Sequence, residues 1–309
     1  MTAYLVSILT FVVLSAVLAL ALNIQWGQAG MINFGLAGFF SIGAYVAAIL
    51  AVSGVDPVSS TLAAIVSTAA LSAIVSLASV RLREDYLAIS TLGFAEAVRL
   101  VLLNESWLTG GPNGIREIPR PFAGVLDPSS YEVAFLGASV LIFAAVYVLL
   151  ERIIRSPFGR ALRTVREDEV VAATLGKNVL ALRVKAFAIG GAVAGLAGAL
   201  HAFYLSYIDP TQFASFVTVY AFMAVVVGGR GSNRGLLIGA STVMVLLEGT
   251  RFLKELLPFM NAQQSAALRL LLVGVALILL LIFRPGGIAR EYRLTAPARD
   301  DAPATAAKT

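Results

Sequence analysis

The chain has 309 residues, of which 59% are hydrophobic and 13% are charged, and its formal net charge is +5. A water-soluble domain is about 45–50% apolar and about 25% charged, so this composition excludes a soluble enzyme or binding domain. The chain has no cysteine and one histidine, His201, which excludes disulfides and Cys- or His-based metal clusters, and we expect no metal and no cofactor.

Apolar segments of membrane-spanning length recur along nearly the whole chain. Crossing about 30 Å of hydrocarbon takes about 20 residues of helix. We therefore predict an all-α integral membrane protein, a polytopic helical bundle of about nine spans (eight to ten), in one transmembrane domain covering 1–288. The expected spans are 4–23, 33–53, 58–80, 86–104, 131–151, 183–205, 214–229, 235–250 and 267–283.

The first apolar run ends in Ala19-Leu20-Ala21, which could imitate a signal-peptidase site. A signal peptide requires a basic region before its apolar core, and no Lys or Arg precedes Arg81. We therefore expect this run to remain as the first span.

A polar, glycine-rich stretch follows the first span, and its candidate substrate-path residues are Asn23, Gln25, Gly27, Gly30, Asn33 and Gly35. Polar backbone at membrane depth is tolerated where it is buried in protein or lines a cavity. We expect interrupted helices here, whose ends could face the charged groups of a zwitterion. Close packing of helices through small residues explains the stretch equally well. A second cluster, Gly228 to Gly235, has the same two interpretations, whereas packing is favoured for the glycines of 190–198.

The fourth span carries Glu96 and Arg99. A charge at the centre of a spanning helix costs about 2.5–3.5 kcal/mol on insertion scales, so the two residues need an explanation. Their i, i+3 spacing allows them to pair on one helical face. The pair either is a self-neutralised structural element or lines the substrate path, and we include both residues among the path candidates.

Lys and Arg residues predict the orientation, because cationic loops are retained in the cytoplasm. Eight of them lie in 151–185, which we place inside; alternation of the spans then places the N-terminus outside and the C-terminus inside. The outer loop 105–130 contains Thr109-Gly110-Gly111-Pro112-Asn113-Gly114, which indicates tight turns and a surface for an outer partner. The tail 289–309 has little to bury, and we expect a disordered cytoplasmic segment.

The segment 155–182 is predicted to form a short amphipathic helix that breaks at Gly176 and Asn178. Its apolar stripe consists of Ala161, Leu162, Val165, Val170, Ala173 and Leu175. Such a helix could dock in a groove of another protein or lie on the bilayer. The acidic run 167–169 disfavours an anionic membrane surface, so we favour docking.

Five segments in order resemble the LivM-type permease subunit of bacterial branched-chain amino acid ABC importers. They are NIQWGQAGMINFGLAGFFSIGAY from Asn23, RLREDYLAISTLGFAEAVRLVLLN from Arg81, LTGGPNGI from Leu108, GRALRTVREDEVVAATLGKN from Gly159, and GGRGSNRG from Gly228. The resemblance implies ATP-driven alternating access for branched-chain or related hydrophobic amino acids, in the bacterial inner membrane. It also implies a heterodimer with a second permease, two cytoplasmic ABC ATPases and a periplasmic or lipid-anchored binding protein, besides membrane lipid and without nucleic acid.

The resemblance further implies ATPase docking on the segment after Pro157. The candidate docking residues are Phe158, Arg160, Arg163, Arg166, Glu167, Asp168, Glu169, Ala172 and Gly176. Many ABC permeases carry Glu-Ala-Ala in this segment, with a Gly after three further residues; here the frame before Gly176 is Val170-Val171-Ala172, and Arg230 stands between glycines where an apolar residue is expected. The chain has no G-x-x-x-x-G-K-[ST] phosphate loop, so it is not expected to be an enzyme, and ATP hydrolysis must come from a partner.

Two other transport functions stay open. A permease for urea or short-chain amides would look similar. An ion-coupled secondary transporter would need an intramembrane carboxylate as ion site, for which Glu96 is the central candidate, and would leave 155–182 without a role. A membrane-embedded enzyme would need clustered catalytic groups, and no such constellation is evident.

Overall fold

The computed structural model describes residues 2–79, 82, 84–121, 128–256, 261–283 and 287–289. Over these residues the chain is helical, and its β pairing is an isolated bridge between Ile115 and Ile208. The first half contains α1 (Thr2–Leu22), the π-helix η1 (Asn23–Gln28), α2 (Leu36–Val52), α3 (Pro57–Ser79), α4 (Glu84–Asn104), α5 (Ser106–Thr109) and the 3₁₀ turn η2 (Gly111–Asn113). The second half contains α6 (Pro128–Arg155), α7 (Pro157–Glu167), α8 (Glu169–Thr174), α9 (Val179–Leu205), the 3₁₀ turn η3 (Pro210–Phe213), α10 (Phe216–Gly228), α11 (Leu236–Leu256) and α12 (Ala262–Phe283).

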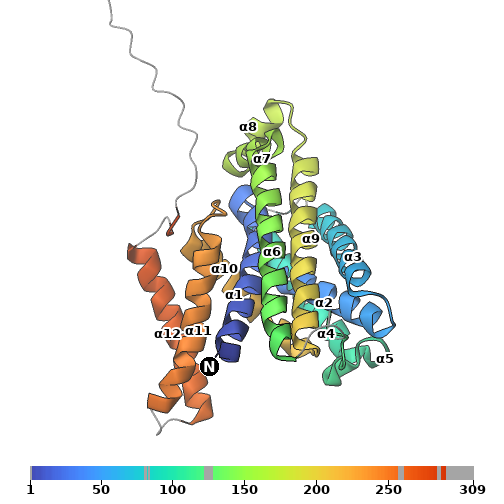
Figure 1. The fold of residues 1–309 in the computed structure, drawn as a ribbon. Coiled ribbons are helices and arrows are strands. Elements are labelled where there is room, and N and C mark those ends of the chain that lie inside the picture. The colour runs from blue at the N-terminus through green and yellow to red at the C-terminus, as the bar shows by residue number, and fades with distance from the viewer. Residues whose placement is uncertain are drawn as a thin grey trace, which may run out of the picture.

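The long helices run up and down in one bundle (Figure 1). One end, here called the α7 end, carries α7 and α8, and the opposite end, the α5 end, carries α5 and the N-terminus (Figure 1). In the described residues, five helices are long and apolar enough to cross a membrane: Tyr4–Gln28, Pro57–Ser79, Asp85–Asn104, Ser130–Arg155 and Val179–Leu205. Each predicted span coincides with a helix, which confirms an all-α polytopic membrane protein.

Two predicted spans are shorter than a full crossing. α2 begins at Leu36 rather than at residue 33 and has 17 residues, and α10 has 13 residues. The N-termini of these two helices meet inside the bundle, where the Ala37 amide donates to Thr218 Oγ1 at 2.9 Å. The expected interruption of helices is thus present after the first span. A second interruption, which contains η3, fills the gap left between the predicted spans 183–205 and 214–229. That α10 begins inside the bundle was not predicted.

The centre of the bundle is built from α1, α2 and α9, where small residues allow close approach. A Cβ on Gly43 would lie 2.4 Å from the Cα of Gly195, and one on Gly198 would lie 2.1 Å from the Phe40 carbonyl oxygen. α3 presents a buried stripe of Ser60, Ala64, Thr68, Ser72, Ser76 and Ser79 to α9. The packing seam predicted for the glycines of 190–198 is therefore confirmed.

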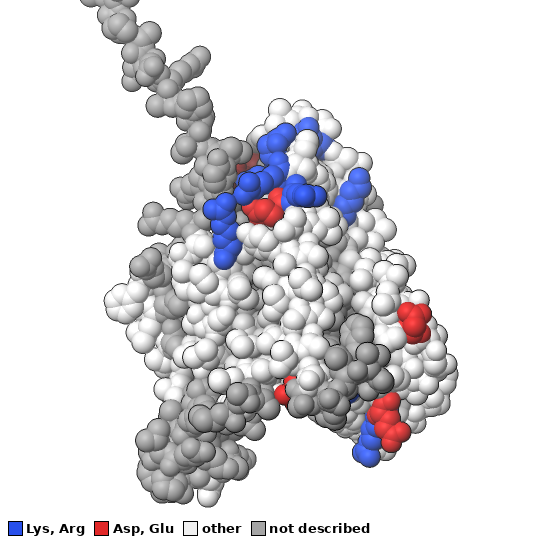
Figure 2. All heavy atoms as spheres, in the orientation of Figure 1, with Lys and Arg blue, Asp and Glu red and all other residues white. Residues whose placement is uncertain are grey.

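Charged residues gather at the ends of the bundle. On the face drawn in Figure 2, Lys and Arg cluster at the α7 end, and the middle of the face is almost free of charge. In the predicted outer loop, Gly110, Gly111 and Gly114 have positive φ, which confirms the tight turns expected there. Residues 122–127 of that loop and residues 290–309 of the predicted disordered tail lie outside the described residues.

Candidate functional site

The segment that leaves the bundle at the α7 end begins with a capped helix. The Ser156 hydroxyl accepts from the Phe158 amide at 3.2 Å, and Pro157 occupies the first turn of α7. Leu162 and Val165 are 0% and 4% exposed, so the apolar face of α7 packs on the bundle. α7 is therefore fixed to the membrane domain along its length.

The structure corrects the prediction of a single helix before Gly176. The helix breaks at Asp168, whose Oδ1 accepts from the amides of Val170 at 2.8 Å and Val171 at 3.0 Å. An aspartate is a favoured N-cap, and here it ends α7 and starts α8. The expected break at Gly176, with φ of +72°, is present, and Asn178 caps α9.

α8 exposes an apolar surface at the tip of the α7 end. Val170, Val171 and Leu175, here called the α8 patch, are 72%, 48% and 65% exposed. The predicted apolar stripe therefore divides: its α7 part is buried and its α8 part is open. The α8 patch was absent from the candidate docking residues, although three large apolar side chains next to an acidic run could have indicated it.

The candidate docking residues separate into two groups. Arg160, Glu167, Asp168, Glu169 and Gly176 are exposed, and Glu169 pairs with Arg183 at 2.7 Å. Ala172 is fully buried, and Phe158 packs against the core. Arg163 donates to the Ile154 carbonyl at 3.2 Å. The exposed group can reach a partner, and the others hold the segment in place.

Arg166 links α7 to the interior of the bundle. Its side chain is 14% exposed, and its Nη1 donates to the Gly27 carbonyl of η1 at 2.5 Å. A Cβ added to Gly30, whose φ is +76°, would lie 2.9 Å from the Arg166 Cγ. Glycine at residue 30 therefore makes room for the arginine, and α7 contacts the end of η1 directly.

η1 is held by a set of buried amides, here called the amide cluster: Asn23, Gln25, Gln28, Asn33 and Asn233. Asn23 donates to Asn233 at 2.8 Å and accepts from the Gly231 amide at 3.0 Å. Gln25 donates to the Phe187 carbonyl at 3.1 Å and accepts from Asn33 at 2.8 Å. A Cβ on Gly27 would come within 2.0 Å of the Asn23 amide oxygen.

The amide cluster joins η1 to α9, to the segment before α2, and to the turn between α10 and α11. Gln28 Nε2 reaches the Gly231 carbonyl at 2.5 Å, and Gln28 Oε1 is buried with no hydrogen-bond partner in the described part of the chain. Four of the predicted path residues, Asn23, Gln25, Gly27 and Asn33, are thus brought together. Asn233 was missed, because nothing local indicates a partner 210 residues away in sequence.

Gly30 and Gly35 lie beside the amide cluster, at its contacts with α7 and α4. A Cβ on Gly35 would lie 2.5 Å from the Thr91 carbonyl oxygen of α4. Glu96 and Arg99 form the predicted ion pair, with Arg99 Nη2 2.5 Å from Glu96 Oε1. They lie further along α4 on its partly exposed side, separate from the amides.

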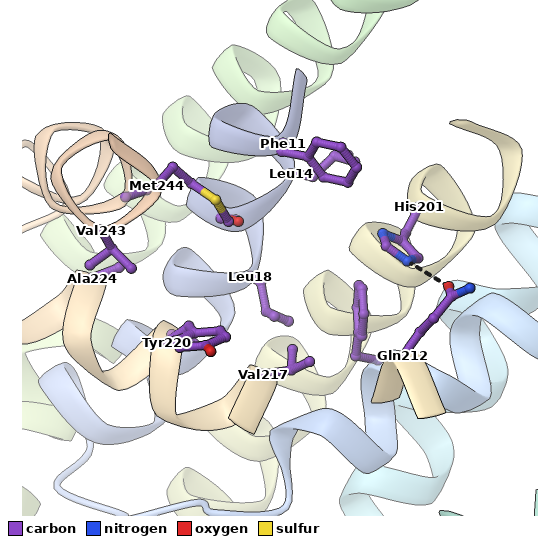
Figure 3. Close-up of a pocket in the computed structure, with 14 residues that line it drawn as sticks. Phe11, Leu14, Leu18, His201, Gln212, Val217, Tyr220, Ala224, Val243 and Met244 are labelled. Carbon is purple, nitrogen blue, oxygen red and sulfur yellow. Dashed lines mark hydrogen bonds between the residues drawn. The ribbon is translucent and has the colours of Figure 1, made fainter. Parts of the chain in front are cut away.

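A cavity of about 130 Å³ lies between α1, α9, α10 and α11 (Figure 3). Its wall is mostly apolar, and His201 Nε2 and Gln212 Oε1 lie 3.2 Å apart on one side of it (Figure 3). None of its lining residues is Asp, Glu, Lys or Arg. The cavity can hold an aliphatic group, but it offers no counter-charge to a zwitterion.

Comparisons with known proteins agree over nearly the whole chain. The family described as "Branched-chain amino acid transport system / permease component" matches residues 4–281. The high-affinity branched-chain amino acid transport system permease proteins LivM of Salmonella typhimurium and Escherichia coli are each 33% identical over 307 residues, which cover 92% of this chain and 69% of theirs. A probable LivM of Methanocaldococcus jannaschii is 30% identical over 91% of this chain and 92% of its own. No solved structure matches significantly.

Proposed function

The chain belongs to the family of permease components of branched-chain amino acid transport systems, and on this premise we propose that it is one membrane subunit of an ABC importer. Its cargo is a branched-chain or related hydrophobic amino acid. The proposal draws on relatives that are named for this cargo and that align with more than nine tenths of the chain. Movement of cargo follows alternating access, driven by ATP that partner subunits hydrolyse.

The observation that carries the proposal is the exposed apolar surface of α8 at the basic end of the bundle. Val170 and Leu175 are 72% and 65% exposed beside charged neighbours, at a tip that projects from the spans. An apolar surface of this kind on a short helix fits a groove on another protein. We infer that one ATPase subunit covers the α8 patch.

The contacts of α7 provide a route from that docking surface to the membrane interior. Arg166 holds the Gly27 carbonyl, and η1 is tied through Asn23 and Gln25 to the segments that lead into α2 and α11. π-helical turns are rare and are frequently found at functional sites. A displacement of α7 would therefore act on η1 and move the helices that meet there.

The same arrangement supports an orientation in the bacterial inner membrane. The basic α7 end faces the cytoplasm, and the α5 end, with the N-terminus, faces the periplasm. A substrate-binding protein, free or lipid-anchored, then approaches the α5 end. A second permease subunit completes the membrane unit as a heterodimer, with two ATPases on its cytoplasmic side. The amide cluster and the Glu96–Arg99 pair are our candidates for polar groups along the substrate path.

Reconstitution tests this function. The chain is assembled in liposomes with its companion permease, ATPases and binding protein, and uptake of leucine, isoleucine, valine and urea is measured with and without enclosed ATP. We expect ATP-dependent uptake of the branched-chain amino acids and not of urea. Val170→Glu in the α8 patch should abolish ATPase attachment. Arg152→Gln, an exposed change on α6 outside the docking segment, is the matched control and should leave attachment intact.

Urea uptake without amino acid uptake would show that the cargo is urea and not a branched-chain amino acid. Normal ATPase attachment in Val170→Glu would contradict the docking assignment.

A further inference from the structure

The exposed side of α4 carries an ion pair near the middle of a membrane-spanning helix. Glu96 and Arg99 are the thirteenth and sixteenth of the 21 residues of α4, about 3 Å and about 8 Å from its midpoint at 1.5 Å per residue. Arg99 Nε lies 3.0 and 3.1 Å from the two Glu96 oxygens, and Nη2 lies 2.5 Å from Oε1. The Arg99 and Glu96 side chains remain 26% and 43% exposed.

A lipid-facing position does not fit this pair. Each charge at such a depth costs about 2.5–3.5 kcal/mol on insertion scales, and charged side chains in spans normally face protein or a water-filled path. The outward faces of α3 and α6 show the contrast. Away from the α7 end, their exposed large residues are all apolar: Val58, Leu62, Val66, Ile74 and Leu77 on α3, and Val133, Val140, Leu141, Val148 and Leu149 on α6. Unlike α3 and α6, α4 carries charged side chains near mid-span on its partly exposed side.

The surface around the pair leaves space. Gly93 has no atom within 4 Å of an added Cβ, and Ser90 and Ala97 are also exposed. Small residues four apart, as Gly93 and Ala97 are, allow another helix or a ligand to come close to the backbone. The pair is thus reachable along this face, although it sits at the depth of the hydrocarbon.

The two groups match the two charges of an amino acid. Arg99 presents a planar set of donors that suits a carboxylate, and Glu96 presents the acceptors that suit an ammonium group. A zwitterion that enters between them exchanges one internal ion pair for two new ones, so charge stays balanced at each stage. The cavity between α1, α10 and α11 has no charged group, so it cannot substitute for this pair.

We propose that Glu96 and Arg99 bind the ammonium and carboxylate groups of the amino acid in a path that runs between α4 and a second permease subunit. This inference rests on the proposed function. The second subunit is required because a path on the open face of α4 would otherwise be bounded by lipid. The site is therefore incomplete in this chain alone, and its other wall belongs to the companion permease.

Discrimination between cargo analogues tests the pair in the reconstituted importer. Leucine uptake is measured in competition with isopentylamine, which lacks the carboxylate, and with 4-methylpentanoate, which lacks the ammonium group. We expect Arg99→Gln to reduce the preference for leucine over the amine by about 10- to 100-fold, because a charge-assisted hydrogen bond is lost. Glu96→Gln should reduce the preference over the acid in the same way. Arg155→Gln, which breaks the exposed ion pair at the end of α6, should change neither preference.

The exchanged variant Glu96→Arg with Arg99→Glu separates binding from structure. A purely structural pair would work in either order, so full uptake by this double variant would overturn the proposal. We expect the variant to assemble with its partners and to retain less than about a tenth of the uptake. Should it fail to assemble, unchanged preferences in the single variants would still overturn the proposal.

The natural absence of cysteine allows a direct test of the second wall. Ala97→Cys on α4 should cross-link to the companion permease in membranes, whereas Ala144→Cys on the exposed face of α6 should react with a lipid-phase thiol reagent instead. Lipid-phase labelling of Ala97→Cys, without cross-linking, would overturn the interface. If the wild-type assembly takes up no leucine, the proposed function fails. If it takes up leucine, but the competition and cross-linking results contradict the expectations above, this inference alone is wrong.

Discussion

The contact between Arg166 and η1 leads to the sharpest prediction about coupling. Arg166→Gln keeps a polar side chain but removes the guanidinium that donates to the Gly27 carbonyl at 2.5 Å. The side chain is 14% exposed, so the change falls inside the bundle and leaves the surface of α7 nearly unaltered. Attachment of an ATPase should therefore persist, and the transmission of its movement to η1 should weaken.

The magnitude follows from the lost contact. A hydrogen bond to a charged donor contributes about 1.5–3 kcal/mol. If that energy links the positions of α7 and η1, its loss shifts their coupling equilibrium by about 10- to 150-fold, since about 1.4 kcal/mol corresponds to a factor of ten. Uptake per ATP hydrolysed should fall by at least tenfold, while hydrolysis itself continues.

The assay measures leucine uptake and phosphate release in the same proteoliposomes. The ratio of the two is compared between the wild type, Arg166→Gln and Arg152→Gln, the last being exposed on α6 and outside the docking segment. Arg152→Gln should keep the wild-type ratio. An unchanged ratio in Arg166→Gln, with ATPase attached, would refute the idea that this arginine transmits motion.

Three further variants test the packing around the path. Gln25→Leu removes the acceptor of the buried Asn33 side-chain amide and one of two donors to the Phe187 carbonyl, which keeps Ser72, and should lower the free energy of unfolding in mixed detergent by about 1–3 kcal/mol. Gly43→Ala places a Cβ 2.4 Å from α9 and should cost about 1–3 kcal/mol, measured as a lower melting temperature of the detergent-solubilised chain. Ala221→Leu partly fills the cavity of about 130 Å³; it should stabilise the fold by about 0.5–2 kcal/mol and slow leucine uptake, because α10 and α11 lose room to move.

Each of these expectations has its own control. Gly137→Ala, on an open face of α6, should not lower the melting temperature, because alanine favours the helix, and equal losses at residues 43 and 137 would argue against the α2–α9 seam. Wild-type stability in Gln25→Leu would mean that the amide cluster holds η1 by shape alone. Unaltered uptake by a stabilised Ala221→Leu protein would show that the cavity has no part in the movement.

Much of the fold could be predicted because the spans obey a length rule. Each predicted run of about 20 apolar residues is helical in the structure, and Gly110, Gly111 and Gly114 lie in tight turns with positive φ, as expected. α10 was predicted as a span of 16 residues, yet it has 13 and starts inside the bundle. Hydropathy cannot reveal such a start, because it gives the length of an apolar run and not its depth in the bundle.

The candidate site was only partly predictable, because its contacts join distant segments. The pairing of Glu96 with Arg99 follows from i, i+3 spacing, and the structure has it. The partners of Asn23 and Arg166 lie 210 and 139 residues away, and no local pattern indicates them. The exposure of Val170 also depends on the break at Asp168. In an uninterrupted helix, Val170 would have been expected on the same apolar face as the buried Leu162 and Val165.

Uptake by the complete importer, with the proton gradient collapsed and ATP kept high, tests the central claim most directly. We predict that leucine enters at the usual rate under these conditions, and that liposomes holding only this chain take up none under any ion gradient. Leucine accumulation by this chain alone, driven by protons or sodium ions and lost in Glu96→Gln, would contradict the account and identify a secondary transporter.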